Sequence, residues 1–293
     1  MDDAAYASAF DAYMFYFSGR EMMRKRLSDA LRTCYHQEGN GLRVLSIGPA
    51  RGHTLEDAMN AVGEEIKLER VDCVECNSVM IAELKERVGL LAANYCFDFN
   101  VYHRKFSVED TTAASFLPSN FYDLIVFNHV LYYFDDPGRV IHEAVCRLTR
   151  NGGHAFVCLN VLNTVGMMCG EINRILQRKG EWKAEAPSIQ WNSFDTRKIL
   201  IDAKMRIILD STDECGVALH IALRPTRPCI CEQDKEMRRL ADCVLSFYAQ
   251  RDVSELAEEE RTQIQSVIRR HTYETYGFPF DKLKIESYLV ARE

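Results

Sequence analysis

The middle of the chain alternates short strand-like segments with longer amphipathic ones, and this rhythm is the feature that most constrains the fold. The strand-like segments cover residues 43–47, 68–75, 97–102, 122–127 and 154–160; the first is an apolar run, and those at 68–75 and 97–102 alternate apolar and polar residues. The segments between them suit helices, as in residues 78–94, where the apolar side chains share one face. Strands that alternate with helices are joined by right-handed crossovers into a parallel sheet. The sequence therefore predicts an α/β fold with a doubly wound, mostly parallel sheet.

The two ends of the chain do not follow this alternation. The first 35 residues are expected to be helical, and they carry a stripe of aromatic side chains. A helix at 195–203 and a strand at 205–211 come late in the chain, and two amphipathic helices follow within residues 214–271. A last strand is expected at 283–291. We predict four parts: an N-terminal helical lid at 1–40, a core at 41–213, a helical insertion on the substrate side at 214–271, and a terminal core strand at 272–293.

Charge and composition argue against several classes of partner. The net charge is -7 without a cluster of Lys and Arg, so the chain is a poor candidate for binding nucleic acid. No stretch approaches the roughly 18 apolar residues of a membrane span, and the N-terminus lacks the regions of a signal peptide. The 11 cysteines are therefore expected to be reduced thiols, with no metal role for the CxxC of Cys73 and Cys76. We expect a cytoplasmic monomer that contacts no membrane.

The turn after the first predicted strand has the composition of a ligand-binding loop. Residues 46–52 read SIGPARG, so Gly48 and Gly52 remove side chains where a ligand would approach the backbone, and Ala50 is the smallest alternative between them. Ligands of open parallel sheets bind at the carboxyl ends of the strands, and the next helix would direct its N–H groups at the ligand. A glycine turn of this kind also links many strands and helices that bind nothing.

The end of the second strand strengthens this interpretation. Glu75 stands there, where an acidic side chain accepts hydrogen bonds from both ribose hydroxyls of a nucleoside. Loop and carboxylate together predict a ligand that contains adenosine. Because the loop departs from the GxGxxG of NAD enzymes, a dinucleotide is the second choice.

Four motifs carry a resemblance to a known family. SIGPARG, VEC, YDLIVFNHVLYYFDDP and LTRNGG, in this order and spacing, resemble the class I S-adenosylmethionine-dependent methyltransferases. More narrowly, the LYY after the fourth strand, the LSFY of the insertion, the terminal SYLV and the chain length are similar to the histamine N-methyltransferase group, which includes carnosine N-methyltransferases. The resemblance runs through nearly the whole chain. It implies a seven-stranded Rossmann-like sheet with an antiparallel last strand, and S-adenosylmethionine as cofactor.

The same resemblance implies roles for individual residues at the cofactor. Gly48 would lie against the methionine part, Glu75 on the ribose and Ser107 near the adenine. Asn128 would end the fourth strand beside the sulfonium. Met80 occupies a position where the family can supply a polar residue on the adenine side. The predicted cofactor-binding residues are Gly48, Ala50, Gly52, Glu75, Met80, Ser107 and Asn128.

His129, Tyr132 and Tyr133 are the candidate catalytic residues on the substrate side. His129 directly follows the fourth strand, and its near-neutral pKa permits hydrogen bonding or proton acceptance, although a histidine satisfied at a strand end is the alternative. Tyr132 and Tyr133 offer aromatic faces for a planar or cationic substrate, with core packing as the other interpretation. The aromatic stripe of the first helix could close the pocket as a lid, through Tyr6, Phe10 and Tyr13.

Several positions differ from the histamine enzymes that the chain resembles. Where that group has a glutamate near the N-terminal helices, a glutamine after the fourth strand and an asparagine in the last strand, this chain has Gly19, His129 and Lys284. Tryptophans that flank the family's pocket align with Val165 and Cys169. An anionic anchor is lost and a cation is gained. We therefore expect an acceptor with a carboxylate or a neutral ring rather than histamine, and Tyr133, Gly19 and Lys284 among the residues that bind it.

The sequence thus predicts the transfer of a methyl group from S-adenosylmethionine to a nitrogen of a small molecule, such as an imidazole, amine or amino-acid derivative. Three alternatives stay open. They are a small-molecule O-methyltransferase that uses His129 as base, a non-catalytic cofactor-binding protein, and a protein methyltransferase whose insertion forms a peptide groove.

Overall fold

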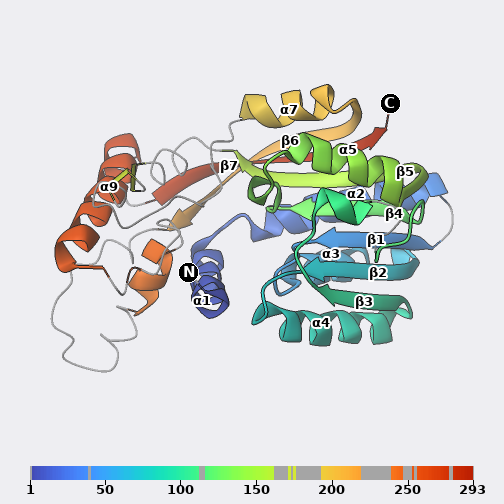
Figure 1. Cartoon of the computed structure of the whole chain (residues 1–293), viewed down its shortest axis with the longest axis horizontal. Coiled ribbons are helices and arrows are strands. Elements are labelled where there is room, and N and C mark those ends of the chain that lie inside the picture. Colours follow the sequence, from blue (N-terminus) through green and yellow to red (C-terminus); the bar gives the residue numbers. More distant parts are fainter. Residues whose placement is uncertain are drawn as a thin grey trace. The chain divides into compact units, whose positions relative to one another are not determined.

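Seven strands form one sheet in the order β3-β2-β1-β4-β5-β7-β6 in the computed structural model of the chain (Figure 1). The structure describes residues 2–38, 41–111, 116–161, 171–172, 174–175, 193–218, 239–246, 253, 256–276 and 280–292. The strands are β1 Leu42–Ile47, β2 Leu68–Glu75, β3 Asp98–His103, β4 Tyr122–Asn128, β5 Thr149–Val161, β6 Met205–Ala218 and β7 Phe280–Arg292. The α-helices are α1 Asp3–Tyr16, α2 Arg20–Glu38, α3 His53–Val62, α4 Met80–Tyr95, α5 Pro137–Leu148, α7 Ser193–Asp202 and α9 Glu258–Tyr276. Short 3-10 helices are η1 Gly63–Glu65, η2 Val108–Thr111 and η3 Leu131–Tyr133.

The centre of the sheet is parallel, as predicted. β1 pairs in parallel with β2 and β4, β2 pairs with β3, and β4 pairs with β5. The arrow of β7 runs opposite to those of β1 and β2 in Figure 1. β2 and β3 lie on one side of β1, and β4 and β5 lie on the other, so the strand order reverses between β1 and β4. Parallel sheets of this kind bind ligands at the carboxyl ends of the strands at such a reversal. The prediction of a doubly wound, seven-stranded sheet is confirmed.

The core of the sheet consists of the apolar runs that marked these strands in the sequence. Val44, Leu45, Leu124 and Ile125 on β1 and β4 are all 0% exposed. Strands buried on both faces need such continuous apolar runs, because helices cover each face of a parallel sheet. The polar ends of the strands are left for turns and for the site.

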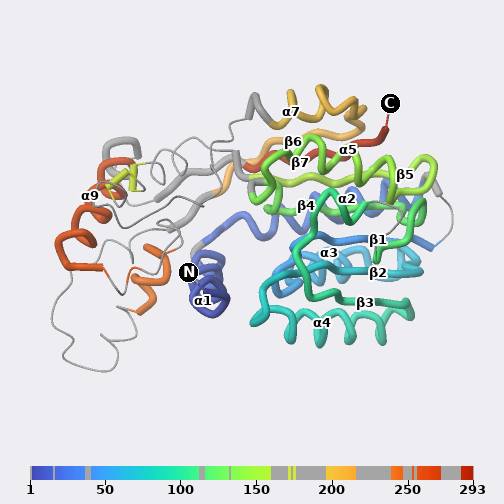
Figure 2. The backbone as a smooth tube through the Cα atoms, in the orientation of Figure 1, coloured from blue at the N-terminus to red at the C-terminus, as the bar shows by residue number. Residues whose placement is uncertain are grey.

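The chain divides into two units, and each is described by itself. Unit 1 comprises residues 1–19, 161–192 and 214–284, and unit 2 comprises residues 20–160, 193–213 and 285–293. The first boundary falls at Gly19, inside the segment 1–40 that was expected to be the lid. Figure 2 traces the backbone along the chain, from blue at the N-terminus to red at the C-terminus. Unit 2 contains α2 and most of the sheet, and with them both motifs that the sequence assigned to the cofactor.

The N-terminal helical segment is not continuous. A single helical stretch was expected over the first 35 residues, but α1 ends at Tyr16 and α2 begins at Arg20. Phe17 is extended, with φ -89° and ψ 120°, and its N–H donates to the Met14 carbonyl. The aromatic spacing continues across this break, which is why the periodicity concealed it, whereas the Ser-Gly pair that follows Phe17 was the local signal for a turn.

β5 and β6 extend furthest beyond their predicted bounds. β5 begins at Thr149, so the Asn-Gly-Gly at 151–153 lies inside the strand instead of forming a turn before it. Its register with β4 shifts between Tyr122 and Leu124, which is the mark of a bulge. β6 continues to Ala218 and so takes the first residues of the predicted insertion.

The two helices predicted in the insertion fall partly within the described residues. Residues 239–246 are helical and contain Leu240 and Val244, and α9 contains Ile264, Val267 and Ile268. Phe247 lies outside the described residues. None of the helices that the structure describes has both the length and the apolar character needed to cross a membrane.

Candidate functional site

The loop from Gly48 to Gly52 follows β1 and takes an unusual backbone conformation. Gly48, Ala50 and Gly52 all have positive φ, at 62°, 53° and 81°. The Gly48 N–H donates to the Val74 carbonyl at 2.8 Å, which ties the loop to β2. A Cβ on Gly48 would lie 2.6 Å from Val130 Cγ2, so no side chain fits there. The glycine is required by its φ and by this protein neighbour, whereas the sequence argument had assigned it only to ligand approach.

Glu75 holds this loop from the end of β2. Its side chain is buried, with 6% of the residue exposed. One carboxylate oxygen, Oε2, accepts the N–H of Ala50 at 2.9 Å, and the other accepts the N–H of Asn77 at 2.8 Å. A carboxylate offers about four acceptor positions. Acceptor capacity for two further hydroxyl groups therefore remains on Glu75, so the carboxylate fits the ribose diol of a nucleoside.

Asn77 was not singled out in the sequence and has a clear structural role. Its side-chain Oδ1 accepts the N–H groups of Val79 and Met80 at 3.0 and 3.1 Å and so caps the start of α4. An asparagine just before a helical pattern was the available signal. Met80 itself is buried, with 1% exposed. Its role toward the cofactor stays a prediction.

Ser107 is engaged by a residue that the sequence analysis also missed. The N–H and Oγ of Ser107 both donate to Asp110 Oδ2, at 2.8 and 3.1 Å. Asp110 is 6% exposed and accepts a further bond from Arg104 at 3.0 Å. These contacts fix the turn after β3. The Ser-x-x-Asp spacing resembles a helix-capping pattern, which could have identified Asp110.

Asn128 and His129 lie side by side at the carboxyl end of β4. Asn128 Oδ1 is buried, and no donor in the described part of the chain reaches it. His129 has a positive φ of 54°, and its N–H donates to the Cys158 carbonyl at 2.8 Å. Its Nε2 lies 3.9 Å from Cys158 Sγ. Asn128 Oδ1 thus has no donor among the described residues, and His129 beside it has a sparsely populated backbone conformation. Both features are expected where a ligand binds.

Burial also sets the charge of His129. Loss of solvent lowers the pKa of His129 to about 4, so the imidazole is neutral at pH 7. The neighbouring thiol is neutral too, because burial raises the pKa of Cys158 to about 12. The end of β4 therefore offers uncharged hydrogen-bonding groups.

This depressed pKa predicts a loss of stability in acid. The unfolded chain protonates His129 below its ordinary pKa of 6.5, but the folded protein resists protonation until about pH 4. Because the unfolded state binds more protons in this window, the free energy of unfolding falls as the pH is lowered through it. We expect a contribution on the order of 2 kcal/mol, less than the full shift, because His129 is only half-buried by its accessible surface.

Urea unfolding of the wild type and of His129→Asn between pH 4 and pH 7 measures this contribution. Asparagine tolerates positive φ and carries no imidazole. The wild type should lose stability more steeply than the variant below pH 6.5. If the free energy of unfolding falls equally with pH in both proteins, His129 has the same pKa in the folded and unfolded states, and the prediction is wrong.

The tyrosines after β4 lie in η3. Tyr133 is 38% exposed, and its N–H donates to the Val130 carbonyl at 3.1 Å. Tyr132 lies in the same turn, and its side chain is outside the described residues. The preceding Leu131 is fully buried and anchors the turn. Tyr133 lies three residues after Val130, the neighbour of Gly48, and its role toward a ligand stays a prediction.

The remaining predicted substrate residues belong to unit 1. On α1, the rings of Tyr6 and Phe10 stack with centroids 6.2 Å apart, and Tyr13 is buried. Gly19 is buried, and Lys284 lies in β7. Val165 and Cys169 lie outside the described residues. The roles of these unit 1 residues toward an acceptor stay predictions.

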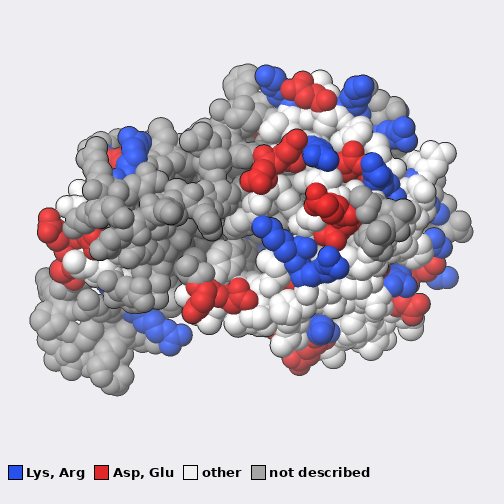
Figure 3. All heavy atoms as spheres, viewed as in Figure 1, with Lys and Arg blue, Asp and Glu red and all other residues white. Residues whose placement is uncertain are grey.

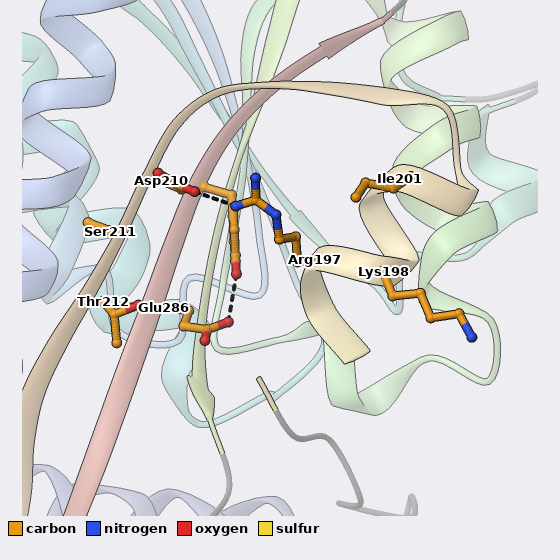
Figure 4. A pocket seen from close by; sticks show the side chains of 8 residues that line it. Arg197, Lys198, Ile201, Asp210, Ser211, Thr212 and Glu286 are labelled. Carbon is orange, nitrogen blue, oxygen red and sulfur yellow. Dashed lines mark hydrogen bonds and ion pairs between the residues drawn. The ribbon is translucent and has the colours of Figure 1, made fainter. Parts of the chain in front are cut away.

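A hollow of about 670 Å³ lies elsewhere in unit 2, between α7, β6 and β7 (Figure 4). Arg197 pairs with Asp210 at its edge, and Tyr288 donates to Glu286 at 2.7 Å. None of the predicted site residues lines it, and Gly48, Glu75 and His129 lie at the carboxyl ends of β1, β2 and β4. We therefore place the functional site at the loop and not in this hollow. Among the described residues, no group of three His, Cys, Asp or Glu side chains is arranged to hold a metal ion.

Known proteins share this architecture. Residues 19–203 match the methyltransferase domain family. Three solved structures have the same fold: a candidate methyltransferase from Bacillus halodurans C-125 (10% identity, 89% of this chain and 97% of that chain, TM-score 0.54), and S-adenosylmethionine-dependent methyltransferases from Thiobacillus denitrificans (13%, 93% and 91%, 0.51) and Geobacter sulfurreducens (14%, 93% and 91%, 0.50). The last two were crystallised with S-adenosyl-L-homocysteine. No curated protein matches the sequence.

The family match covers most of the chain and includes the Gly48–Gly52 loop, Glu75 and the end of β4. The parallel sheet with its strand order confirms the architecture on which that family is built. The chain therefore belongs to the methyltransferase domain family, the class I enzymes whose methyl donor is S-adenosylmethionine.

Proposed function

We propose that this chain transfers a methyl group to a nitrogen of a small molecule, such as an imidazole, an amine or an amino-acid derivative. The observation that carries the proposal is the neutral His129 at the end of β4, beside the loop that would bind the donor. The resemblance of the LYY, LSFY and SYLV segments to the histamine and carnosine N-methyltransferases supports the same class of acceptor.

The residues of the loop and of β2 fit the donor. Glu75 would accept the ribose hydroxyls with its remaining lone pairs, and the backbone of Gly48, Ala50 and Gly52 would lie along the rest of the molecule. When bound, S-adenosylmethionine supplies an electrophilic methyl group on its sulfonium. The buried Asn128 Oδ1 is a second acceptor at the same edge of the sheet.

The protein's own contribution is to position the acceptor and to exclude water. Correct placement of two reactants corresponds to effective molarities of roughly 10⁵–10⁸ M, so little more is needed when the nucleophile already has a free lone pair. A hydroxyl acceptor must also lose its proton. With a pKa of about 4, His129 is a weak proton acceptor, and it is better suited to hold a nitrogen acceptor by a hydrogen bond.

The surface supports a small acceptor over a nucleic acid. Lys and Arg side chains alternate with Asp and Glu over the described part of the face in Figure 3, with no broad basic area. A polyanion would need such an area to bind.

We further propose that the acceptor carries a carboxylate or a neutral ring, because Gly19 removes an anionic anchor of the histamine enzymes and Lys284 adds a cation.

A methyl-transfer screen tests the proposal. Purified protein is incubated with labelled S-adenosylmethionine and a panel of amines, imidazoles, amino-acid derivatives and phenols, and products are read by mass spectrometry. We expect label on nitrogen. Label on a phenol oxygen would contradict the proposed acceptor, and tight binding of S-adenosylhomocysteine without transfer to any compound would favour a non-catalytic role.

Replacement of His129 tests its role in the same assay. We expect His129→Asn to lower kcat/KM for the acceptor by about 100-fold while the Kd for S-adenosylhomocysteine changes less than about threefold, because only acceptor positioning is lost. His36→Asn is the control, since His36 is exposed on α2 and should change neither value. An equal loss of turnover and cofactor affinity in His129→Asn would assign the residue to the fold instead.

A further inference from the structure

Ion pairs connect the Gly48–Gly52 loop to α4, and a further pair connects α4 to α3. Arg51 of the loop donates to Glu83 Oε2 at 2.6 Å, and Arg87 donates to the other oxygen of Glu83 at 2.8 Å. Arg87 also pairs with Glu56 on α3. The side chains of Arg51 and Arg87 are only 17% and 18% exposed, so these pairs are less screened by water than ordinary surface pairs.

Arg87 contacts the backbone of the loop as well. Its Nε donates to the Arg51 carbonyl at 2.9 Å. The carbonyl and the next N–H of a trans peptide point in opposite directions. On the other side of this peptide, the Gly52 N–H donates to the Pro49 carbonyl at 2.9 Å. The peptide plane between Arg51 and Gly52 is thus held at both ends.

The stem of Arg87 also packs closely on the loop. A Cβ on Gly52 would lie 3.4 Å from Arg87 Cδ and 2.8 Å from Leu84 Cδ1. Arg87 therefore fixes the loop by packing, by a backbone hydrogen bond and by its link to Glu83. It does so from α4, whereas Glu75 holds Ala50 from β2.

A loop with this backbone needs such support. Left-handed φ is unfavourable for Ala50, and a loop without ties would sample other conformations in which its N–H groups no longer face one ligand. A ligand would then have to order the loop on binding, which weakens affinity.

We infer that Arg87 is a positioning residue for the methyl donor: it holds the Gly48–Gly52 loop in the binding conformation through the Arg51 carbonyl and Glu83, without itself touching the ligand. The inference rests on the cofactor site proposed above. Glu83 and Arg87 on α4 would then support the donor site from outside it.

Isothermal titration with S-adenosylhomocysteine tests the role of Arg87. Arg87→Met keeps much of the apolar stem and removes the guanidinium, and we expect it to raise the Kd about tenfold or more, since a hydrogen bond to a charged group and its ion pairs are lost. Glu83→Gln should weaken binding in the same direction. Arg87→Lys retains the charge and should recover part of the affinity.

Arg147→Met is the matched control. It removes an arginine that pairs with Glu143 one turn away on α5, outside the loop, and should leave the Kd unchanged. If the wild type binds S-adenosylhomocysteine and Arg87→Met binds it equally well, the inference is wrong. If the wild type itself does not bind, it is the cofactor site that fails.

Amide hydrogen exchange separates positioning from a general loss of stability. In Arg87→Met we expect faster exchange at the Ala50 and Gly52 amides, with the amides of β1 protected as in the wild type. An equal rise in exchange along β1 and β4 would show that Arg87 supports the whole fold and would overturn the assignment.

Discussion

Replacement of Glu75 by glutamine is expected to weaken the binding of S-adenosylhomocysteine by at least about 100-fold. Two ribose hydroxyls would lose a charged acceptor, and each such hydrogen bond contributes about 1.5–3 kcal/mol. The substitution also disturbs the protein. Glu75 accepts the N–H groups of Ala50 and Asn77 with separate oxygens, and glutamine has only one oxygen to offer. Its amide NH₂ would face one of these N–H groups, donor against donor.

The measurement is isothermal titration of Glu75→Gln and of a charge-matched control on the same strand. Glu69→Gln removes the same charge at the other end of β2, where Glu69 pairs with Arg43 on the surface. That variant should bind like the wild type. A folded Glu75→Gln protein that binds within about threefold of the wild type would remove the carboxylate from the donor site, and with it the main support for this placement.

The sheet was predictable because its strands are short segments that are either apolar or alternate apolar and polar residues. β2 has the bounds expected from the sequence, where this alternation runs from Leu68 to Glu75. Elements whose ends are set by pairing were not predictable in the same way. β5 begins earlier than expected because a bulge lets Thr149 pair with Tyr122, and only the partner strand reveals that.

The site residues were likewise predictable only where a local sequence pattern marked them. Gly48, Ala50 and Glu75 were identified because a small-residue turn and a strand-end acid are local patterns, and the structure joins them through the 2.9 Å bond from Ala50 to Glu75. Contacts between distant segments left no such pattern. Arg87 reaches Arg51 only because α4 packs on the loop, and Cys158 meets His129 only because β5 pairs with β4.

The loop and the end of β4 are also coupled to each other. Val130 follows His129 directly, and its Cγ2 occupies the space beside Gly48. Ile47 and Phe127 are partners in the register of β1 and β4, so the two strands deliver the donor loop and the acceptor residues to the same place. A change at Gly48 should therefore affect both halves of the site.

Gly48→Ala is expected to abolish measurable binding of S-adenosylhomocysteine and to lower the free energy of unfolding by roughly 2–4 kcal/mol. The alanine would have to adopt φ 62°, and its Cβ would lie 2.6 Å from Val130 Cγ2. The backbone strain and the overlap add, and either a shift of the loop or a shift of Val130 would relieve them. Both shifts displace groups that form the site. Urea unfolding and isothermal titration measure the two effects.

Gly63→Ala separates strain from overlap. Gly63 also has a positive φ, 51°, but a Cβ there would meet nothing within 4 Å. With φ 51° and ψ -132°, this control should lose roughly 1–3 kcal/mol of stability and bind normally, because it bears backbone strain without a clash. In Gly48→Ala/Val130→Ala the overlap is removed, so we expect stability to recover toward that of the control and part of the binding to return. If the double variant is no more stable than Gly48→Ala, the contact with Val130 does not explain why this position requires glycine.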